Sequence, residues 1–415
     1  MGLGYDGLSL ACAAAEGGFT VIGLDSDAER LAGLRAGSPP VGGVPQTLFR
    51  SASQTGRLSF TEDSGRLEDT DIVMICAPTP VRDHVPDLSH IEDSCRQVAG
   101  YLRTGHLVIL ESMSHPGTTD HVVRPLLESS GLRAGADFLL AHSPHRIDPG
   151  NEEFTLRNIP KVVGGVTPDA TGLATIFYGQ LVDKVVAVSS CRAAELVKLL
   201  ENAFRHVNIA LANELAMHCN EDGIDVWEVL EAAETKPFGF MPFQPGPGVG
   251  GHGIPLESTS MPWWVRGDGS RPYRVLEQAQ DVNARMPAYV AGRIGDALNE
   301  TGKAVNRANI LVMGVSYKPD VADVRESPAL RVMAHLLRRG ARVSFHDPYV
   351  ESVTVGGTVL GRMQLTQNVI ARSDCVAILT PHRAYDLDWI AGHAKLVFDA
   401  RNAFGPDRRP NVTRL

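Results

Sequence analysis

The first 25 residues carry the pattern that most restricts how this chain can fold. A glycine-rich turn, GLGYDG, places glycines at Gly2, Gly4 and Gly7, and an Ala-rich helical segment and a strand ending at Asp25 follow it. Glycines in this arrangement permit a tight turn and let the backbone approach a pyrophosphate at the helix N-terminus. Asp25 stands at about the spacing, ~20 residues, of the acidic residue that binds the adenosine ribose. The stretch therefore predicts a dinucleotide site that favours NAD over NADP.

One part of this pattern is missing. A buried strand should precede the glycine turn, but the sequence starts at Met1, directly before Gly2. Because that strand lies at the centre of such a sheet, its absence would leave two neighbouring strands with unpaired edges. Three explanations stay open: a recorded start that is too late, a trimmed chain, or a damaged copy.

Composition narrows the class of protein and its partners. The chain has 415 residues, enough for two or three domains, and a net charge of −9, which argues against nucleic acid or an anionic membrane as a partner. Its six cysteines are scattered without CxxC spacing, which is typical of free thiols in a reducing compartment, and no metal site is expected. No apolar run approaches the ~20 residues that span a membrane. We expect a soluble cytoplasmic protein without a signal peptide.

Short apolar runs without alternation predict buried strands of the parallel type in the first third of the chain. These runs are Asp71–Cys76, Leu107–Leu110, Phe138–Ala141, Lys161–Val163 and Lys184–Val188. A second βαβ pattern begins at Asn309, with a helix at Pro328–Arg339 and strands at Arg342–Asp347, Cys375–Leu379 and Leu396–Ala400. Long helices are expected between them, at Cys191–His218 and over Pro272–Thr301, the latter interrupted by Pro287.

The expected fold class is therefore α/β, with two Rossmann-like doubly wound domains joined by a helical middle domain. We place an NAD-binding domain at 1–190, a central helical domain with the loop 236–257 and a connecting helix at 191–305, and a second doubly wound domain at 306–415. No internal repeat or low-complexity tract is apparent.

The stretch Lys236–Glu257, KPFGFMPFQPGPGVGGHGIPLE, is too rich in Gly and Pro to form a helix or an ordinary strand. Its backbone can approach a ligand closely, and Phe238, Phe240 and Phe243 could wall an apolar site. The alternative is a long surface linker.

Several motifs together resemble the UDP-glucose/GDP-mannose dehydrogenase family, from Gly2 to about Asn402. The motifs are APTP at 77–80, ESMSHPGTT at 111–119, SPHRIDPGN at 143–151, AELVKLLENAFRHVNIALANELA at 194–216, PGPGVGGHGIPLE at 245–257, GVSYKPDVADVRESPA at 314–329 and HDPYV at 346–350. The resemblance implies NAD as cofactor, a nucleotide sugar as substrate, and two successive oxidations that turn an alcohol into a carboxylate. It also implies a homodimer built on the middle helices. The resemblance further implies that the domain at 306–415 binds the nucleotide sugar and that the loop 236–257 belongs to the active site. Details of the motifs are more similar to the branch that acts on UDP-N-acetylhexosamines or their uronates.

The resemblance assigns roles to residues of this chain. Lys198 and Asn202, spaced i, i+4 on one helical face, would stabilise the developing oxyanion, although from spacing alone they could be an ordinary solvated pair. Glu257 would support the nucleophile. On the cofactor side the implied contacts are Thr79 and Ser112. On the substrate side they are Arg205, Phe240, Gly250, Gly251, Lys318 and Arg401. For Lys318 and Arg401 the alternative is a structural ion pair with Asp320 or Asp323.

This chain departs from the family pattern at three positions. The nucleophilic Cys of the family is Gly253 here, its active-site Thr is Met113, and the Glu that handles protons during thioester hydrolysis is His145. A histidine can act as a general base near neutral pH, but it can equally be a hydrogen-bonded residue under a loop. Since all three changes affect the second oxidation, a single sequencing error does not explain them.

Three functions remain open at this point. The first is an NAD-dependent oxidoreductase on a nucleotide sugar that stops after one hydride transfer, with His145 or Lys198 taking the hydroxyl proton. The second is a conventional dehydrogenase that makes a uronic acid. The third is a non-catalytic protein that binds NAD and a nucleotide sugar.

Overall fold

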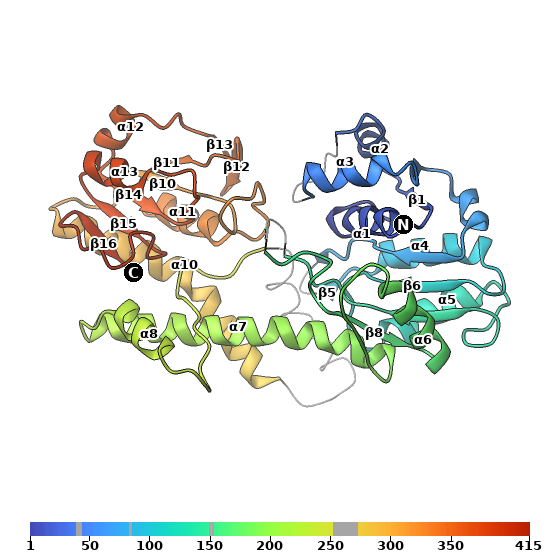
Figure 1. The fold of residues 1–415 in the computed structure, drawn as a ribbon. Helices are drawn as coiled ribbons and strands as arrows, with labels where there is room; N and C mark the ends of the chain where they lie inside the picture. Colours follow the sequence, from blue (N-terminus) through green and yellow to red (C-terminus); the bar gives the residue numbers. More distant parts are fainter. Residues whose placement is uncertain (39–43, 83–84, 149–150, 152, 252–272) are drawn as a thin grey trace. The chain divides into compact units, whose positions relative to one another are not determined.

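A computed structural model describes residues 1–38, 44–82, 85–148, 151, 153–251 and 273–415. Contacts within the chain divide the described residues into two compact units, Met1–Glu201 and Asn202–Leu415 (Figure 1). Each unit is considered by itself below. The predicted domain boundaries at residues 190 and 305 stay predictions.

The first unit contains the α/β arrangement expected of a nucleotide-binding domain. Its helices are α1 (Tyr5–Glu16), α2 (Ala28–Arg35), α3 (Gln46–Gln54), α4 (Ser89–Tyr101), α5 (Arg124–Glu128), α6 (Pro168–Tyr178), the 3₁₀ turn η1 (Ser64–Asp69) and the π turn η2 (Thr119–Val123). Its strands are β1 (Val21–Leu24), β2 (Leu58–Thr61), β3 (Ile72–Ile75), β4 (Val81–Arg82), β5 (Val85–Pro86), β6 (Leu107–Leu110), β7 (Leu139–His142), β8 (Lys161–Gly165) and β9 (Val185–Ala187).

The main sheet of this unit has the order β3-β6-β7-β8-β9. Each of the five apolar runs in the sequence forms one of these strands. The parallel assignment is wrong at one position, because β8 runs antiparallel to β7, pairing Ala141 with Gly165. Both strands are buried, and a continuous apolar run does not reveal the direction of a strand buried on both faces.

The strands of the first unit form two separate sheets at this point. β1 and β2 form a separate parallel pair, and Met1–Leu3 contact both β1 and β3. The amino group of Met1 donates to Met74 O at 2.7 Å, and Gly2 N donates to Leu24 O at 2.9 Å. These contacts place Met1–Leu3 where the end of the central strand would lie. A groove beside them is lined by apolar side chains that include Ile22, Leu24, Leu67, Val73 and Met74.

Two long helices dominate the middle of the chain in Figure 1, α7 (Cys191–Glu221) and α10 (Arg274–Glu300), with the shorter α8 (Val226–Glu234). The predicted interruption at Pro287 is wrong, because α10 continues through it. Proline cannot donate to Asn283 O, the acceptor four residues earlier in the helix. That carbonyl lies beside Gly248 of the glycine-rich stretch, which packs on the helix at this point.

The second βαβ pattern forms a five-stranded parallel sheet of order β11-β10-β14-β15-β16. Its strands are β10 (Asn309–Met313), β11 (Arg342–His346), β14 (Cys375–Ile378), β15 (Val397–Asp399) and β16 (Val412–Arg414). The helices are α11 (Pro328–Arg338), α12 (Gln367–Arg372) and α13 (Leu387–His393), and β12 (Ser352–Val355) and β13 (Thr358–Gly361) form a hairpin. The doubly wound prediction for this part is confirmed.

Hydrophobic clusters cover both faces of each large sheet. In the C-terminal part, one cluster joins α10 and α11 to Ile310, Val312 and Phe398, and another joins α12 and α13 to Leu311 and Val376. Alternate residues of the same strand therefore face opposite helix layers, as parallel sheets require. No helix among the described residues is long and apolar enough to cross a membrane.

Candidate active site

The glycine turn has the geometry of a dinucleotide cradle. Gly2 has a φ of +83°, which L side chains rarely adopt, and a Cβ on Gly7 would overlap Gly2 O. By contrast, a Cβ on Gly4 would meet nothing within 4 Å, so space is open in front of the N-terminus of α1. A diphosphate placed there would meet the backbone N–H groups of the first helical turn and the positive end of the helix dipole. The residues present therefore fit an NAD pyrophosphate.

Asp25 already holds the turn together. Its carboxylate accepts hydrogen bonds from Leu3 N at 2.6 Å and Asp27 N at 2.9 Å, and Arg30 Nη1 contacts both of its oxygens at 3.0 and 2.9 Å. With 8% of its surface exposed, Asp25 lies at the end of β1 where a ribose would sit. The predicted contact with the ribose hydroxyls therefore has to share this carboxylate with Arg30.

The two predicted cofactor loops follow β3 and β6 at the same edge of the sheet. Thr79 is 6% exposed and lies on the first loop. Ser112, on the second, donates from its hydroxyl to Ile75 O at 3.2 Å and so ties its loop to β3. Their direct contact with NAD stays a prediction.

Helix α7 is anchored to these loops on both sides of Lys198. One turn before it, the buried Glu195 accepts hydrogen bonds from Gly117 N at 2.6 Å, Thr119 N at 2.8 Å and the Thr119 hydroxyl at 2.7 Å. Burial raises the pKa of the Glu195 carboxyl to about 7, although these donors favour its charged form. The helix segment that carries Lys198 is thereby held against the ESMSHPGTT turn.

A second anchor lies just after Lys198. Arg146 Nη2 donates to Glu201 Oε1 at 2.5 Å and Nε donates to Oε2 at 3.3 Å, while Nη1 donates to Pro160 O at 2.5 Å. A two-pronged contact of this kind fixes orientation as well as distance. It holds the loop that carries His145 against α7.

A buried polar cluster contacts the loop that carries His145. Lys161 Nζ lies 2.6 Å from Glu111 Oε2 and donates to Pro144 O at 3.2 Å, and the Tyr178 hydroxyl donates to Glu111. Lys161 is 3% exposed and Glu111 is 1% exposed. Such a pair is stable only when its remaining hydrogen-bonding groups are satisfied, as they are here. The cluster fixes the backbone next to His145.

His145 itself lies against the glycine turn. Its Nε2 is 2.7 Å from Asp6 Oδ1, and its ring packs edge-on against Tyr5. Lys198 lies close enough to Asp6 to contribute to its electrostatic environment. The first unit thus brings together the glycine turn, His145 and Lys198. Asp6 was not predicted as a site residue, because it occupies a variable position of GxGxxG. Its contact with His145, on the loop after β7, becomes visible only in the three-dimensional structure.

In the second unit, the glycine-rich stretch packs against the C-terminal domain. A Cβ on Gly250 would lie 2.8 Å from Pro328 Cδ, and one on Gly251 would lie 2.8 Å from the Tyr317 ring. Gly251 N donates to Arg325 O at 3.1 Å. Only glycine allows so close an approach, so this part of the stretch is a shaped segment and not a surface linker.

The same segment passes over Arg401. A Cβ on Gly246 would lie 3.0 Å from Arg401 Nε and closer still to its terminal nitrogen. Gly246 N donates to Asn213 Oδ1 at 2.9 Å, and Asn213 donates to Asn283 at 2.8 Å, so α7 and α10 hold the segment in place. Burial lowers the pKa of Arg401 to about 10, partly offset by Asp399, and the group stays cationic at neutral pH.

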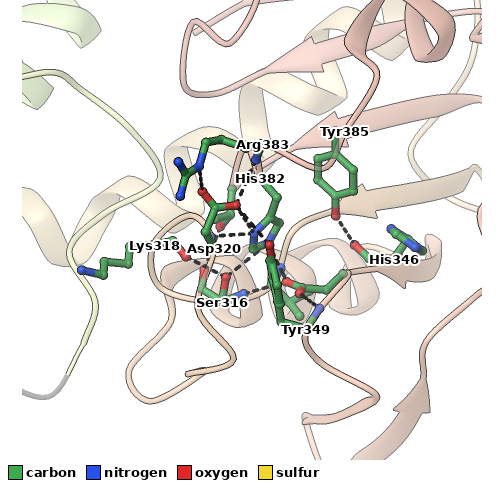
Figure 2. A network of polar contacts seen from close by, with 11 residues as sticks. Ser316, Lys318, Asp320, His346, Tyr349, His382, Arg383 and Tyr385 are labelled. Carbon is green, nitrogen blue, oxygen red and sulfur yellow. Dashed lines mark hydrogen bonds and ion pairs between the residues drawn. The ribbon is translucent and has the colours of Figure 1, made fainter. Parts of the chain in front are cut away.

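The loop that carries Lys318 is held by a network around His382 (Figure 2). His382 Nδ1 accepts from Asp320 N at 2.9 Å, and Nε2 lies 3.0 Å from Asp347 Oδ2 and 3.3 Å from Ser316 Oγ. In Figure 2 the Lys318 side chain points away from this network, on a loop fixed by the Ser316 hydroxyl, which donates to Lys318 O at 2.9 Å.

Despite its composition, this network is not a hydrolytic triad. Serine and aspartate approach the same nitrogen, Nε2 of His382, whereas a triad needs them on opposite nitrogens. Both carboxylates considered as alternative partners of Lys318 and Arg401 have an arginine beside them, and Asp320 pairs with Arg383 at 2.6 Å. Asp323 pairs with Arg325, also at 2.6 Å.

The remaining predicted residues are less informative. Asn202 is buried, one turn after Lys198 on α7, whereas Arg205 is exposed on the same helix. Phe240 is 40% exposed and Phe238 72%, so neither walls an enclosed apolar site within the second unit. Gly253 and Glu257 lie outside the described residues.

A glycine turn suited to NAD, a Lys–Asn pair on one helix and a second doubly wound parallel sheet fit the class of NAD-dependent oxidoreductases. Three family profiles match the chain. They describe the NAD binding domain (residues 1–182), the central domain (192–285) and the UDP binding domain (311–406) of the UDP-glucose/GDP-mannose dehydrogenase family. The chain belongs to this family and is an NAD-dependent nucleotide-sugar dehydrogenase that acts on a CH–OH group.

Individual proteins of the family show similarity over nearly the whole chain. The UDP-N-acetyl-D-mannosamine dehydrogenase of Pyrococcus horikoshii is 33% identical, with 97% of this chain and 94% of that protein covered. The UDP-N-acetyl-D-mannosamine dehydrogenase of Yersinia pestis is also 33% identical, with 93% of both covered. A solved UDP-D-ManNAc dehydrogenase from Pyrococcus horikoshii superimposes with a TM-score of 0.89 at 32% identity, covering 100% of this chain and 97% of that one.

Proposed function

We propose that this protein oxidises the sugar alcohol of a UDP-N-acetylhexosamine with NAD and stops after one hydride transfer, at the aldehyde. The relatives named above act, by their names, on UDP-N-acetyl-D-mannosamine, and this supports the substrate class. The stop after one step follows from Gly253, Met113 and His145, which replace three residues that the family uses in the second oxidation.

The observation that carries the proposal is the state of the cysteines. The second oxidation needs a thiolate that captures the aldehyde, so that a hydride can leave the resulting thiohemiacetal. All six cysteines lie among the described residues; five are buried and Cys76 is half-buried. Burial raises the pKa of the thiols to about 12 at Cys12, Cys76, Cys95 and Cys375, and raises that of Cys191 further. Cys219 is 5% exposed in a hydrophobic cluster. None of them offers an accessible thiolate in place of Gly253.

In the proposed mechanism NAD, when bound, accepts the hydride. Lys198 and Asn202 polarise the oxygen of the oxidised carbon, and their spacing on one face of α7 lets both reach the same atom. His145 or Lys198 takes the hydroxyl proton. Lys318 and Arg401 hold the diphosphate and nucleotide, a task for which the planar donor fork of arginine is suited.

A homodimer is proposed on the evidence of α7. Apolar side chains are exposed along this helix at Leu196 (40%), Leu200 (58%), Phe204 (47%) and Leu211 (64%). An exposed apolar stripe of this length is typical of a surface that another protein covers. We propose a cytoplasmic location, three domains at 1–190, 191–305 and 306–415, and neither nucleic acid nor membrane as a partner.

Two other functions give different products. A conventional dehydrogenase would convert the same substrate to a uronate, and a non-catalytic protein would bind NAD and UDP-sugar without forming NADH. The test is incubation of the protein with NAD and UDP-N-acetylmannosamine, UDP-N-acetylglucosamine or UDP-glucose, followed by mass spectrometry. We expect a product that has lost two hydrogens. A product that has also gained one oxygen would contradict the proposal.

A matched variant sharpens this test. Gly253→Cys restores the family nucleophile without touching the cofactor turn or the Lys198–Asn202 pair. If the proposal is right, the variant shifts product toward the carboxylate, whereas Gly253→Ser leaves it at the aldehyde. If neither protein forms NADH although both bind NAD by calorimetry, the non-catalytic function is the correct one.

A further inference from the structure

Asp6 and His145 form a pair that neither the family pattern nor the predicted site residues include. Asp6 lies in the first turn of α1, within the glycine turn, and His145 lies on the loop after β7. Asp6 Oδ1 is 2.7 Å from His145 Nε2. The Tyr5 ring packs against the imidazole with its centroid 6.1 Å away and the planes at 84°. The imidazole is therefore held at one nitrogen and on one side.

The other ring nitrogen has no such restraint. His145 is 7% exposed, and both of its ring nitrogens are buried without a hydrogen bond of regular geometry among the described residues. Nε2 has the 2.7 Å contact with the Asp6 carboxylate, whereas Nδ1 has no such contact. A carboxylate beside Nε2 favours the tautomer with the proton on Nε2, which leaves the lone pair on Nδ1. Leaving a buried polar atom unpaired costs free energy, and such atoms in native structures call for a functional or ligand-bound explanation.

Charged groups on two other elements, α7 and β8, lie near the pair. Burial of Asp6 opposes its ionisation, but His145, Lys198 on α7 and Lys161 on β8 outweigh it and lower the pKa of Asp6. Lys161 is itself paired with Glu111. Asp6 therefore stays a carboxylate at neutral pH.

The other titratable neighbours do not compete for His145. Arg146, next in sequence, is bound to Glu201 and to Pro160 O. The Cys76 thiol, at the end of β3 close to Asp6, stays neutral because burial raises its pKa to about 12. The imidazole thus has one anionic partner, Asp6, in the part of the chain that the structure describes.

We propose that Asp6 is a positioning residue that orients His145 as the base of the oxidation, with Nδ1 as the atom that receives the proton. The O–H bond of the sugar alcohol breaks, its electron pair forms the C=O bond as the hydride leaves the carbon, and the proton goes to Nδ1. Asp6 stabilises the resulting imidazolium, and the proton passes to solvent when product leaves. This inference rests on the proposed function.

The assignment also separates the roles of His145 and Lys198. Lys198 is held one turn after Glu195 and contributes a positive charge near Asp6, which suits it to polarise the carbonyl oxygen rather than to accept a proton. His145, with a lone pair on its buried Nδ1, suits the work of a general base.

The decisive experiment is nitrogen NMR of histidine-labelled full-length protein, with the His145 signals assigned from His145→Gln. We expect His145 to be mainly the Nε2–H tautomer in the wild type. Asp6→Asn removes the charge at nearly unchanged size, and should raise the share of the other tautomer. Asp183→Asn, which breaks an exposed pair with Arg157 in the same unit, should leave the tautomer unchanged.

Kinetics provide the second readout. Asp6→Asn should lower kcat about 100-fold with little change in KM and shift the acidic limb of the pH profile, and Asp6→Glu should recover part of the loss. An unchanged tautomer of His145 in Asp6→Asn would overturn the inference, even if activity fell. The NMR result needs no turnover, so the two proposals can fail separately. A protein that shows the expected tautomer but forms no NADH would refute the proposed function and the role of His145 as base together. A protein that forms NADH, but whose His145 tautomer does not change in Asp6→Asn, would refute the role of Asp6 alone.

Discussion

Replacing Glu195 tests how the first unit holds helix α7, which carries Lys198. The Glu195 carboxylate is 1% exposed and accepts from two backbone N–H groups, Gly117 and Thr119, and from the Thr119 hydroxyl. In Glu195→Ala the hydroxyl can turn to another acceptor, but the two N–H groups are left buried and unpaired at about 1–3 kcal/mol each. We therefore expect a loss of about 4 kcal/mol of stability in the unit that contains Glu195.

Calorimetry or near-UV circular dichroism during heating measures this loss. For a unit of this size, ~2–4 °C per kcal/mol corresponds to a fall of about 10 °C in the transition of the first unit. Glu195→Gln keeps one acceptor oxygen and should lose about half as much. If Glu195→Ala melts within about 2 °C of the wild type, the reasoning about this anchor is wrong. NAD added in excess should raise the melting temperature of the first unit in both the wild type and Glu195→Ala, because it binds the folded state.

Two further predictions concern stability and substrate binding. Burial lowers the pKa of His142 to about 3, with Lys161 adding to the effect, and that of His206 to about 4, from an ordinary 6.5. The folded protein thus resists protonation of these histidines while the unfolded chain takes up protons. The free energy of unfolding is therefore kept above pH 6.5 and falls as the pH drops toward 4, by about 1.4 kcal/mol per pH unit for each histidine. Urea unfolding across this range should show that slope and His206→Gln should reduce the slope, whereas a flat profile would refute the prediction. Gly246→Ala should raise the Kd for UDP about tenfold in titration calorimetry, because the added Cβ would press on Arg401. The control is Gly392→Ala on α13, where an added Cβ would have no neighbouring atom within 4 Å and the Kd should stay unchanged. Equal affinities of the two variants would contradict the placement of UDP at Arg401.

Much of the fold could be predicted from local patterns. The run Leu107–Leu110 is β6 at both of its predicted ends, and the Ala-rich segment after the glycine turn is α1. Burial on both faces removes alternation, so the same signal could not show that β8 is antiparallel to β7. The hairpin of β12 and β13 was not predicted, because its strands are short and more than half of their residues are exposed.

The candidate site was predictable where chemistry follows from spacing or motif. Lys198 and Asn202 lie on one helix four residues apart, and the glycine turn takes the strained geometry that its glycines indicate. Asp6 and Glu195 were not assigned, since their roles depend on contacts with residues far away in sequence, His145 and Thr119. Pro287 was read as a break because local rules ignore the segment at Gly248 that packs beside the carbonyl of Asn283.

The central claim is that oxidation ends after one hydride transfer because no thiolate is present to capture the aldehyde. The most direct test is the amount of NADH formed per UDP-sugar consumed, measured with limiting substrate and an aldehyde trap such as hydroxylamine. We expect one NADH per sugar and an oxime of the trapped product. Two NADH per sugar, with a uronate that escapes the trap, would contradict it.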